Sequence, residues 1–141
     1  MKCLIVKQAF AQWIVQDAKH IEWRKQRTYI RGRIGIMEPG TWHSPDGLMR
    51  RIVGDVDLYD CYLEIDGIEK GNFRWCLRNP RTYKAPVFVP FQRGPQVWVN
   101  AEYEEPTEFL PLLTGTEQLY AELDCIHAER IFFQKYKGFI K

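Results

Sequence analysis

The chain has 141 residues, a hydrophobic content of 45%, an aromatic content of 14% and a net charge of +2 at pH 7. This length and composition predict one domain with a real core and exclude two domains of ordinary size. No apolar run reaches the roughly 18 residues of a membrane span, and the apolar run at the start is too short for a secretory signal, so we expect a cytoplasmic protein.

The first predicted elements are a short buried strand over residues 2–7 and an amphipathic helix that begins at Gln8. Helical spacing predicts a buried stripe of four residues on this helix: Phe10, Trp13, Ile14 and Ala18. A tight turn and a second strand follow, up to Arg24.

In that second strand the period changes to two, which separates its charged residues from its apolar ones. Ile21 and Trp23 point one way, and Glu22 and Arg24 share the other face. Trp23 is either a core residue, as its apolar parity indicates, or an aromatic plane near the barrel mouth on which a base can stack. Lys19, at the joint between helix and strand, can reach the same face. The interpretations are a site formed by an amine, a carboxylate and a guanidinium, or a solvated edge whose lysine favours the helix dipole.

Residues 30–37 alternate as a half-buried strand with a basic outer face, and residues 38–47 are dense in turn residues, so we expect a loop there. Trp42 and His43 in that loop are either ordinary exposed residues or a rim that offers an aromatic plane and a proton carrier to a ligand.

The longest predicted strand covers residues 50–65, with a bulge near Asp60 where the apolar parity changes. Residues 73–77 form a strand or short turn before Asn79-Pro80. Residues 83–91 form a strand that two prolines confine to an edge or a bulge. With residues 97–99 closing the pattern, the short strands and single early helix predict an α+β fold built on a small closed or nearly closed barrel.

Charge is divided unevenly along the chain. Residues 70–93 contain six Lys or Arg, including Arg78 and Arg81, and no acidic residue; residues 19–33 add six more against Glu22 alone. Residues 101–129 are acidic and contain no Lys or Arg, with a predicted helix beginning near Thr116. We therefore expect a domain over 1–100 and an acidic, partly helical extension over 101–141 packed on it.

The four cysteines contain no C-x-x-C pair, so we expect reduced and mostly buried thiols, no metal site and no cofactor.

Several motifs in order resemble the ASCH domain, a family of the PUA-like superfamily. Gln8-Ala9-Phe10-Ala11 followed by Lys19, Glu22 and Arg24 is similar to its opening Q-P-[YFW]-A and K-x-x-E-x-R pattern. Later segments match in sequence order: 32–34, 52–61, 75–80 and 86–98. Two positions depart from the pattern, with Ala9 in place of the proline and Asp17 in place of a glycine; aspartate tolerates the left-handed backbone such a turn requires.

The resemblance implies a PUA-like barrel with the N-terminal helix at its mouth, and an RNA-linked role with the lysine and glutamate in a cleft. The resemblance and the charge pattern together suggest eight ligand-binding residues: Gln8, Lys19, Glu22, Arg24, Trp42, His43, Arg78 and Arg81. Cations would bind phosphates, aromatic planes would stack bases, and Glu22 would accept from a base amino group.

Two alternatives stay open. The first is a hydrolase acting on a nucleoside amide or on RNA. A group related to this family hydrolyses acylated cytidine amides with a catalytic lysine that matches Lys19, but Glu22 stands where that group has its threonine nucleophile. Here Glu22 would instead orient a water, and Lys19 would hold the oxyanion or act as base. The other alternative is a protein-interaction module whose acidic segment binds a basic partner or the basic face of the chain itself.

Overall fold

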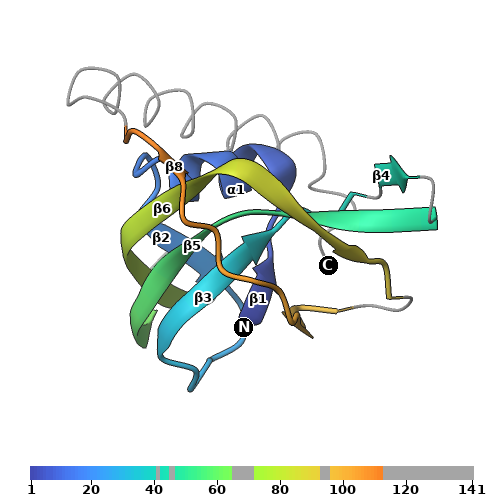
Figure 1. Cartoon of the computed structure of the whole chain (residues 1–141). Helices are drawn as coiled ribbons and strands as arrows, with labels where there is room; N and C mark the ends of the chain where they lie inside the picture. The colour runs from blue at the N-terminus through green and yellow to red at the C-terminus, as the bar shows by residue number, and fades with distance from the viewer. Residues whose placement is uncertain (41, 45–46, 65–71, 93–95, 113–141) are drawn as a thin grey trace.

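The computed structural model describes residues 1–40, 42–44, 47–64, 72–92 and 96–112 (Figure 1). Its elements are β1 (Lys2–Ile5), α1 (Gln8–Val15), β2 (Ile21–Arg24), β3 (Gly32–Met37), β4 (Trp42–Ser44), β5 (Gly47–Glu64), β6 (Asn72–Pro90), β7 (Trp98–Asn100) and β8 (Phe109–Leu110). No helix in these ranges is long and apolar enough to cross a membrane. The C-terminal helix predicted near Thr116 lies outside the described residues.

The strands form one sheet in the order β2-β6-β5-β3-β1-β7, with β4 added to β5 and β8 to β6. The pairing of β1 with β3 is parallel, and the other ladders are antiparallel. The sheet curls into a half-barrel, and α1 packs against β5, β6 and β3 (Figure 1). The prediction of a small barrel-like sheet with one early helix is therefore confirmed.

Side chains rather than a strand ladder connect the two ends of this sheet. Trp75 of β6 stacks on Trp98 of β7, with ring centroids 5.8 Å apart and an interplanar angle of 12°. Arg24 at the end of β2 donates a hydrogen bond from Nη2 to the carbonyl oxygen of Ile5, 2.9 Å away, just after β1 turns toward α1. Among the described residues β2 and β7 share no ladder, so these contacts close the curl.

The two long strands account for one confirmed prediction and one wrong one. A register shift between Leu58 and Asp60 confirms the bulge predicted in β5. The Asn79-Pro80 signal was expected to separate two strands, but β6 is continuous from Asn72 to Pro90. The ladder passes from Arg78 to Arg81 without pairing the two residues between them, and Asn79 has φ 53°. A bulge thus absorbs the proline, which has no N–H to donate.

The segment 38–47 is also more regular than its composition predicts. Residues 42–44 form β4, which pairs with residues 47–49 of β5 as a hairpin. Composition alone does not reveal this ladder, because three residues within a segment rich in turn residues are enough to form it.

The helix α1 presents part of the predicted stripe to the core. Ile14 and Ala18 are buried as predicted, together with Ala11 and Val15, whereas Phe10 and Trp13 are only partly buried and contact each other with centroids 5.5 Å apart. The Thr82 hydroxyl donates to the carbonyl oxygen of Val15 at 2.6 Å, which fixes the end of the helix on β6.

A buried carboxylate ties the centre of the sheet together. Asp55 of β5 is 0% exposed and accepts hydrogen bonds from Arg33, from Arg81 and from the hydroxyl of Tyr83. Tyr83 in turn contacts the hydroxyl of Tyr103 at 2.9 Å. A buried charge is tolerated when it is paired and fully hydrogen-bonded, and Asp55 meets both conditions.

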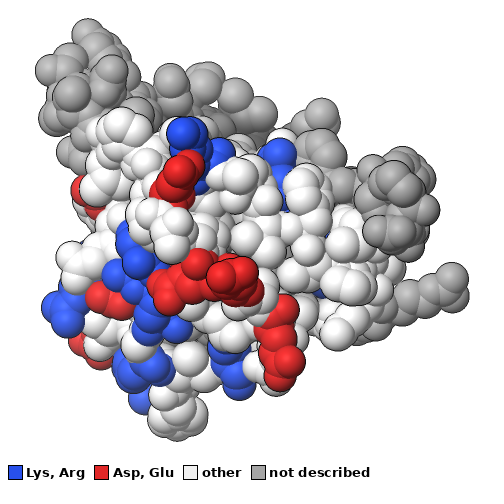
Figure 2. Space-filling model, in the orientation of Figure 1, with Lys and Arg blue, Asp and Glu red and all other residues white. Residues whose placement is uncertain are grey.

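The described part of the acidic segment lies along β6. Glu105 forms an ion pair with Arg81, Glu108 lies 3.4 Å from Lys84, and β8 pairs with Thr82 and Tyr83. Figure 2 shows acidic and basic side chains side by side on this face, rather than in separate patches. Part of the basic charge of residues 70–93 is therefore neutralised within the chain.

Candidate nucleic-acid interface

The turn between α1 and β2 places the residues of the K-x-x-E-x-R motif. Asp17 has φ 64°, the left-handed conformation predicted for this turn. Its N–H bonds to the carbonyl oxygen of Ile14 at 3.2 Å, and the N–H of Ala18 bonds to that of Trp13 at 2.8 Å. This pair of bonds is the Schellman motif that commonly ends a helix. The aspartate turn predicted from the sequence is confirmed.

The orientation of β2 is the reverse of what its apolar residues predict. Glu22 is 8% exposed and faces inward, whereas Trp23 is 42% exposed on the outer face. The prediction that Trp23 belongs to the core is wrong, although the prediction that Glu22 and Arg24 share a face agrees with the ion pair between them. The register explains the reversal, because Glu22 lies opposite the buried Trp75, and Trp23 opposite Arg74.

The inward face of β2 and the turn before it carry three charged side chains, of which Lys19 and Glu22 are buried and Arg24 is partly buried. The Arg24 Nη2 atom lies 3.7 Å from the Glu22 Oε2 atom, and its guanidinium lies over the Trp75 ring, 5.7 Å from the centroid. Lys19 is 9% exposed, with its Nζ atom 5.2 Å from the centroid of the Phe10 ring. We call Lys19, Glu22 and Arg24 the inner cluster.

A cavity of about 260 Å³ lies beside the inner cluster, where β2 and the start of β7 face each other. Its lining consists of Arg24, Lys25, Gln26, Trp75 and Val97. Arg24 is the member of the inner cluster that lines it. The combination of a guanidinium, a lysine and an indole is suited to an anionic ligand with a flat ring.

The outer face of the same strands carries a row of exposed aromatic rings around an arginine. Trp23, Arg74 and Tyr62 are directly opposite one another on β2, β6 and β5. The Arg74 guanidinium lies 5.9 Å from the Trp23 ring centroid and 5.8 Å from that of Tyr62. Glu64 approaches Arg74 to 3.4 Å at the end of the row. We call Trp23, Tyr62 and Arg74 the outer row.

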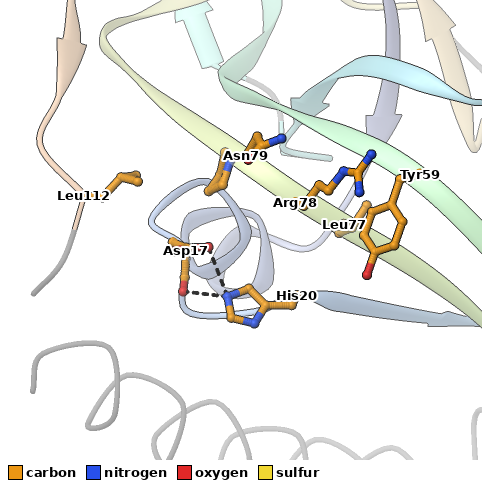
Figure 3. A pocket seen from close by; sticks show the side chains of 8 residues that line it. Asp17, His20, Tyr59, Leu77, Arg78, Asn79 and Leu112 are labelled. Carbon is orange, nitrogen blue, oxygen red and sulfur yellow. Dashed lines mark hydrogen bonds and ion pairs between the residues drawn. The ribbon is translucent and has the colours of Figure 1, made fainter. Parts of the chain in front are cut away.

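A second cavity, of about 460 Å³, opens next to the turn after α1 (Figure 3). Asp17 and His20 line it from the turn, and Tyr59 and Arg78 from β5 and β6. Sequence reasoning selected Arg78 here but missed His20 and Tyr59. The available signal was the i, i+3 spacing of Asp17 and His20, which lets a carboxylate orient an imidazole across a turn.

The remaining predicted site residues are scattered. Gln8 is exposed at the start of α1, and Arg81 is held by Asp55 and Glu105. The hydrogen bonds that Arg81 donates to the Asp55 carboxylate raise the pKa of Arg81 above its ordinary value, so its cation is fixed within the fold. Trp42 and His43 belong to β4, and their side chains lie outside the described residues.

The thiols and carboxylates of the described residues do not assemble a metal site. Cys3, Cys61 and Cys76 are free and buried, which confirms the prediction for these three; Cys125 lies outside the described residues. No group of three or more His, Cys, Asp or Glu in the described ranges is placed to hold a metal ion. Comparison of the chain with protein-family models and with curated protein sequences found no match.

Proposed function

We propose that this protein binds RNA or a modified nucleobase through the inner cluster. The observation that carries the proposal is the inward face of β2, on which Glu22 and Arg24 lie 3.7 Å apart, with Lys19 buried in the turn that precedes them. The resemblance of these residues to the K-x-x-E-x-R motif of ASCH domains supports the same assignment.

Each member of the inner cluster has a distinct part in the proposed recognition. Arg24 lines the cavity of about 260 Å³ and offers the guanidinium donors that do not bond to Ile5 to a phosphate or a base carbonyl. Lys19 adds a second positive charge. Glu22 accepts hydrogen bonds from an exocyclic amino group such as that of cytosine. Because Lys19 and Glu22 are buried, their contacts discriminate more strongly between ligands than the same contacts on an open surface.

The outer row favours a polymer over a free base as the ligand. Its two exposed rings, Trp23 and Tyr62, are the kind of plane on which unpaired bases stack, worth about 1–3 kcal/mol per base. Arg74 between them supplies charge for the backbone. A single strand that leaves the inner cluster around the edge of β2 reaches this row.

The test is a titration of labelled single-stranded RNA into the full chain at two salt concentrations. We expect affinity to fall with salt, and to fall at least about tenfold in the variant that combines Lys19→Ala with Arg24→Ala. Lys84→Ala is the matched control, because Lys84 is an exposed cation on β6 that forms an ion pair with Glu108. Circular dichroism of each variant checks the fold, since Arg24 also bonds to Ile5.

A preference for base type tests Glu22 separately. Wild-type protein should bind oligocytidine more tightly than oligouridine, and Glu22→Gln should reduce that preference, since uridine has no amino group for a carboxylate to accept from. The proposal is rejected if RNA does not bind at low salt, or if binding ignores both salt and the double substitution.

One observation favours a second function, hydrolysis of a nucleoside amide. An amine that acts as a base or holds an oxyanion works best out of water, and Lys19 is 9% exposed in the same part of the fold as the buried carboxylate of Glu22. Incubation with N4-acetylcytidine, followed by chromatography, would show cytidine accumulating with wild-type protein and not with Lys19→Ala. Equal and negligible turnover in both proteins would remove this second function.

A further inference from the structure

The cavity of about 460 Å³ beside the turn after α1 is open to solvent, and its volume falls within the range of small-ligand sites. Its polar groups come from two directions, with Asp17 and His20 on one side and Arg78 with Tyr59 on the other (Figure 3). Leu77, Pro80 and Leu112 add apolar wall. None of these residues belongs to the inner cluster.

Arg78 is a cation that the fold orients without neutralising. Its guanidinium lies over the Tyr59 ring, with the Cζ atom 4.4 Å from the ring centroid. The aspartate directly opposite it on β5 is Asp57, the expected partner. The Asp57 carboxylate, however, lies 3.2 Å from Arg33 Nε and accepts from Asn79 Nδ2 at 3.2 Å. Among the described residues Arg78 therefore has no ion pair, and its donors are available to a ligand.

His20 is oriented by the residue that makes the helix-ending turn. Its Nε2 atom lies 3.0 Å from both the Asp17 carbonyl oxygen and the Asp17 Oδ1 atom. Both of those oxygens accept hydrogen bonds, so Nε2 carries the hydrogen and the other ring nitrogen, Nδ1, remains for a ligand. Nδ1 can accept a hydrogen bond from a phosphate hydroxyl, or donate one to a phosphate oxygen when both ring nitrogens carry hydrogens.

We propose that this cavity binds the phosphate group of a nucleotide, with the Arg78 guanidinium and the His20 imidazole as its two holding groups. The planar guanidinium of Arg78 matches two phosphate oxygens, and its contact with the Tyr59 ring restricts where it can lie. The one carboxylate in the lining, that of Asp17, is engaged by His20. The volume exceeds what a phosphate ion needs, and the apolar wall leaves room for a sugar and base. This site goes beyond the inner cluster and does not depend on it.

The experiment compares cytidine 5′-monophosphate with cytidine in calorimetric titrations of the full chain at fixed pH and salt. We expect saturable binding of the monophosphate, weaker saturable binding of inorganic phosphate at the same site, and much weaker binding of cytidine that does not change in Arg78→Ala. Arg78→Ala should weaken the monophosphate at least about tenfold, as for loss of charge-assisted hydrogen bonds. Arg78→Lys should lose most of that affinity too, because it keeps the charge but not the planar guanidinium.

Lys84→Ala is again the matched control, an exposed cation on the same strand outside the cavity. Because Arg78 is exposed, its substitution leaves the core intact. Imidazole ¹⁵N signals give a second measurement: His20 should shift on addition of the monophosphate in wild-type protein and not in Arg78→Ala. Equal affinity for cytidine and its monophosphate, or equal affinity of Arg78→Ala and Lys84→Ala, overturns the proposal.

The two proposals fail separately. If the inner-cluster double variant binds RNA normally while Arg78→Ala loses the monophosphate, only the proposed function is wrong. If the double variant loses RNA while Arg78→Ala binds the monophosphate normally, only the phosphate site is wrong. A longer RNA that uses the phosphate site would lose affinity in both variants.

Discussion

Gly54 is the position at which the packing of α1 on the sheet is most sensitive to one added atom. A Cβ at this residue would lie 2.1 Å from the carbonyl oxygen of Arg81 and 2.7 Å from the Cγ1 atom of Val15. The first neighbour is backbone and cannot rotate away, so β6 or the end of α1 must move. Movement there strains the 2.6 Å hydrogen bond from Thr82 to Val15.

The expected loss of stability for Gly54→Ala is about 3 kcal/mol. Overpacking a well-packed site costs roughly 1–3 kcal/mol and more where backbone must shift, whereas the reduced entropy of the unfolded chain returns only about 0.4–1 kcal/mol. Gly40→Ala is the matched control, because a Cβ at Gly40 meets no atom within 4 Å and its backbone is unstrained. We expect that substitution to leave stability within about 0.5 kcal/mol of wild type.

Urea unfolding followed by tryptophan fluorescence measures both variants. At slopes of about 1–3 kcal/mol per molar urea, the Gly54→Ala midpoint should fall by roughly 1–3 M with the slope unchanged. The reasoning is refuted if the two glycine substitutions shift the midpoint equally, because the close approach of α1 would then carry no energetic weight.

Three further predictions concern buried groups and the turn. Asp55→Asn should lower the free energy of unfolding by about 3–5 kcal/mol in urea titrations, because it leaves the guanidinium groups around Asp55 without their buried counter-charge; a loss below about 1 kcal/mol would contradict this. Burial raises the pKa of Tyr103 to about 12, so the folded state keeps a proton that the unfolded chain loses above about pH 10. This group should therefore lower the free energy of unfolding by about 1.4 kcal/mol per pH unit between about pH 10 and 12. In urea titrations over that range, the free energy of unfolding of Tyr103→Phe should fall less steeply with pH than that of wild type. Asp17→Gly keeps the left-handed turn, so stability should change by less than about 1 kcal/mol, while calorimetry should show weaker binding of cytidine 5′-monophosphate because His20 loses its orienting carboxylate; unchanged affinity would show that the carboxylate has no such role.

Local structure could be predicted from the sequence where a single residue or a change of apolar pattern has one clear physical cause. Asp17 marks the left-handed turn because few other residues tolerate that backbone. The change of parity near Asp60 marks a bulge because a strand cannot otherwise move its apolar residues to the other face. Both features depend on neighbours in sequence, and both are present in the structure.

Predictions that depend on distant partners were the ones that failed. Trp23 has core chemistry, but its place opposite Arg74 puts it outside, and Glu22 takes the inward position opposite Trp75. Arg81 looked like a free cation in a basic segment, yet Asp55 lies 26 positions earlier and holds it. Neither relation is visible until the register of β6 against β2 and β5 is known, and periodicity does not give register.

The turn at Asp17 joins the two proposed sites, because residues on its far side alternate between them. Lys19, a member of the inner cluster, is buried, and the next residue, His20, lines the cavity proposed to bind phosphate. Strand period then brings Glu22 inward. One residue more or fewer between the turn and β2 would exchange the inward and outward faces, placing Trp23 inside and Glu22 in water. The spacing of the motif is therefore a geometric requirement: it allows one short segment to present a carboxylate to the barrel interior and an imidazole to the surface.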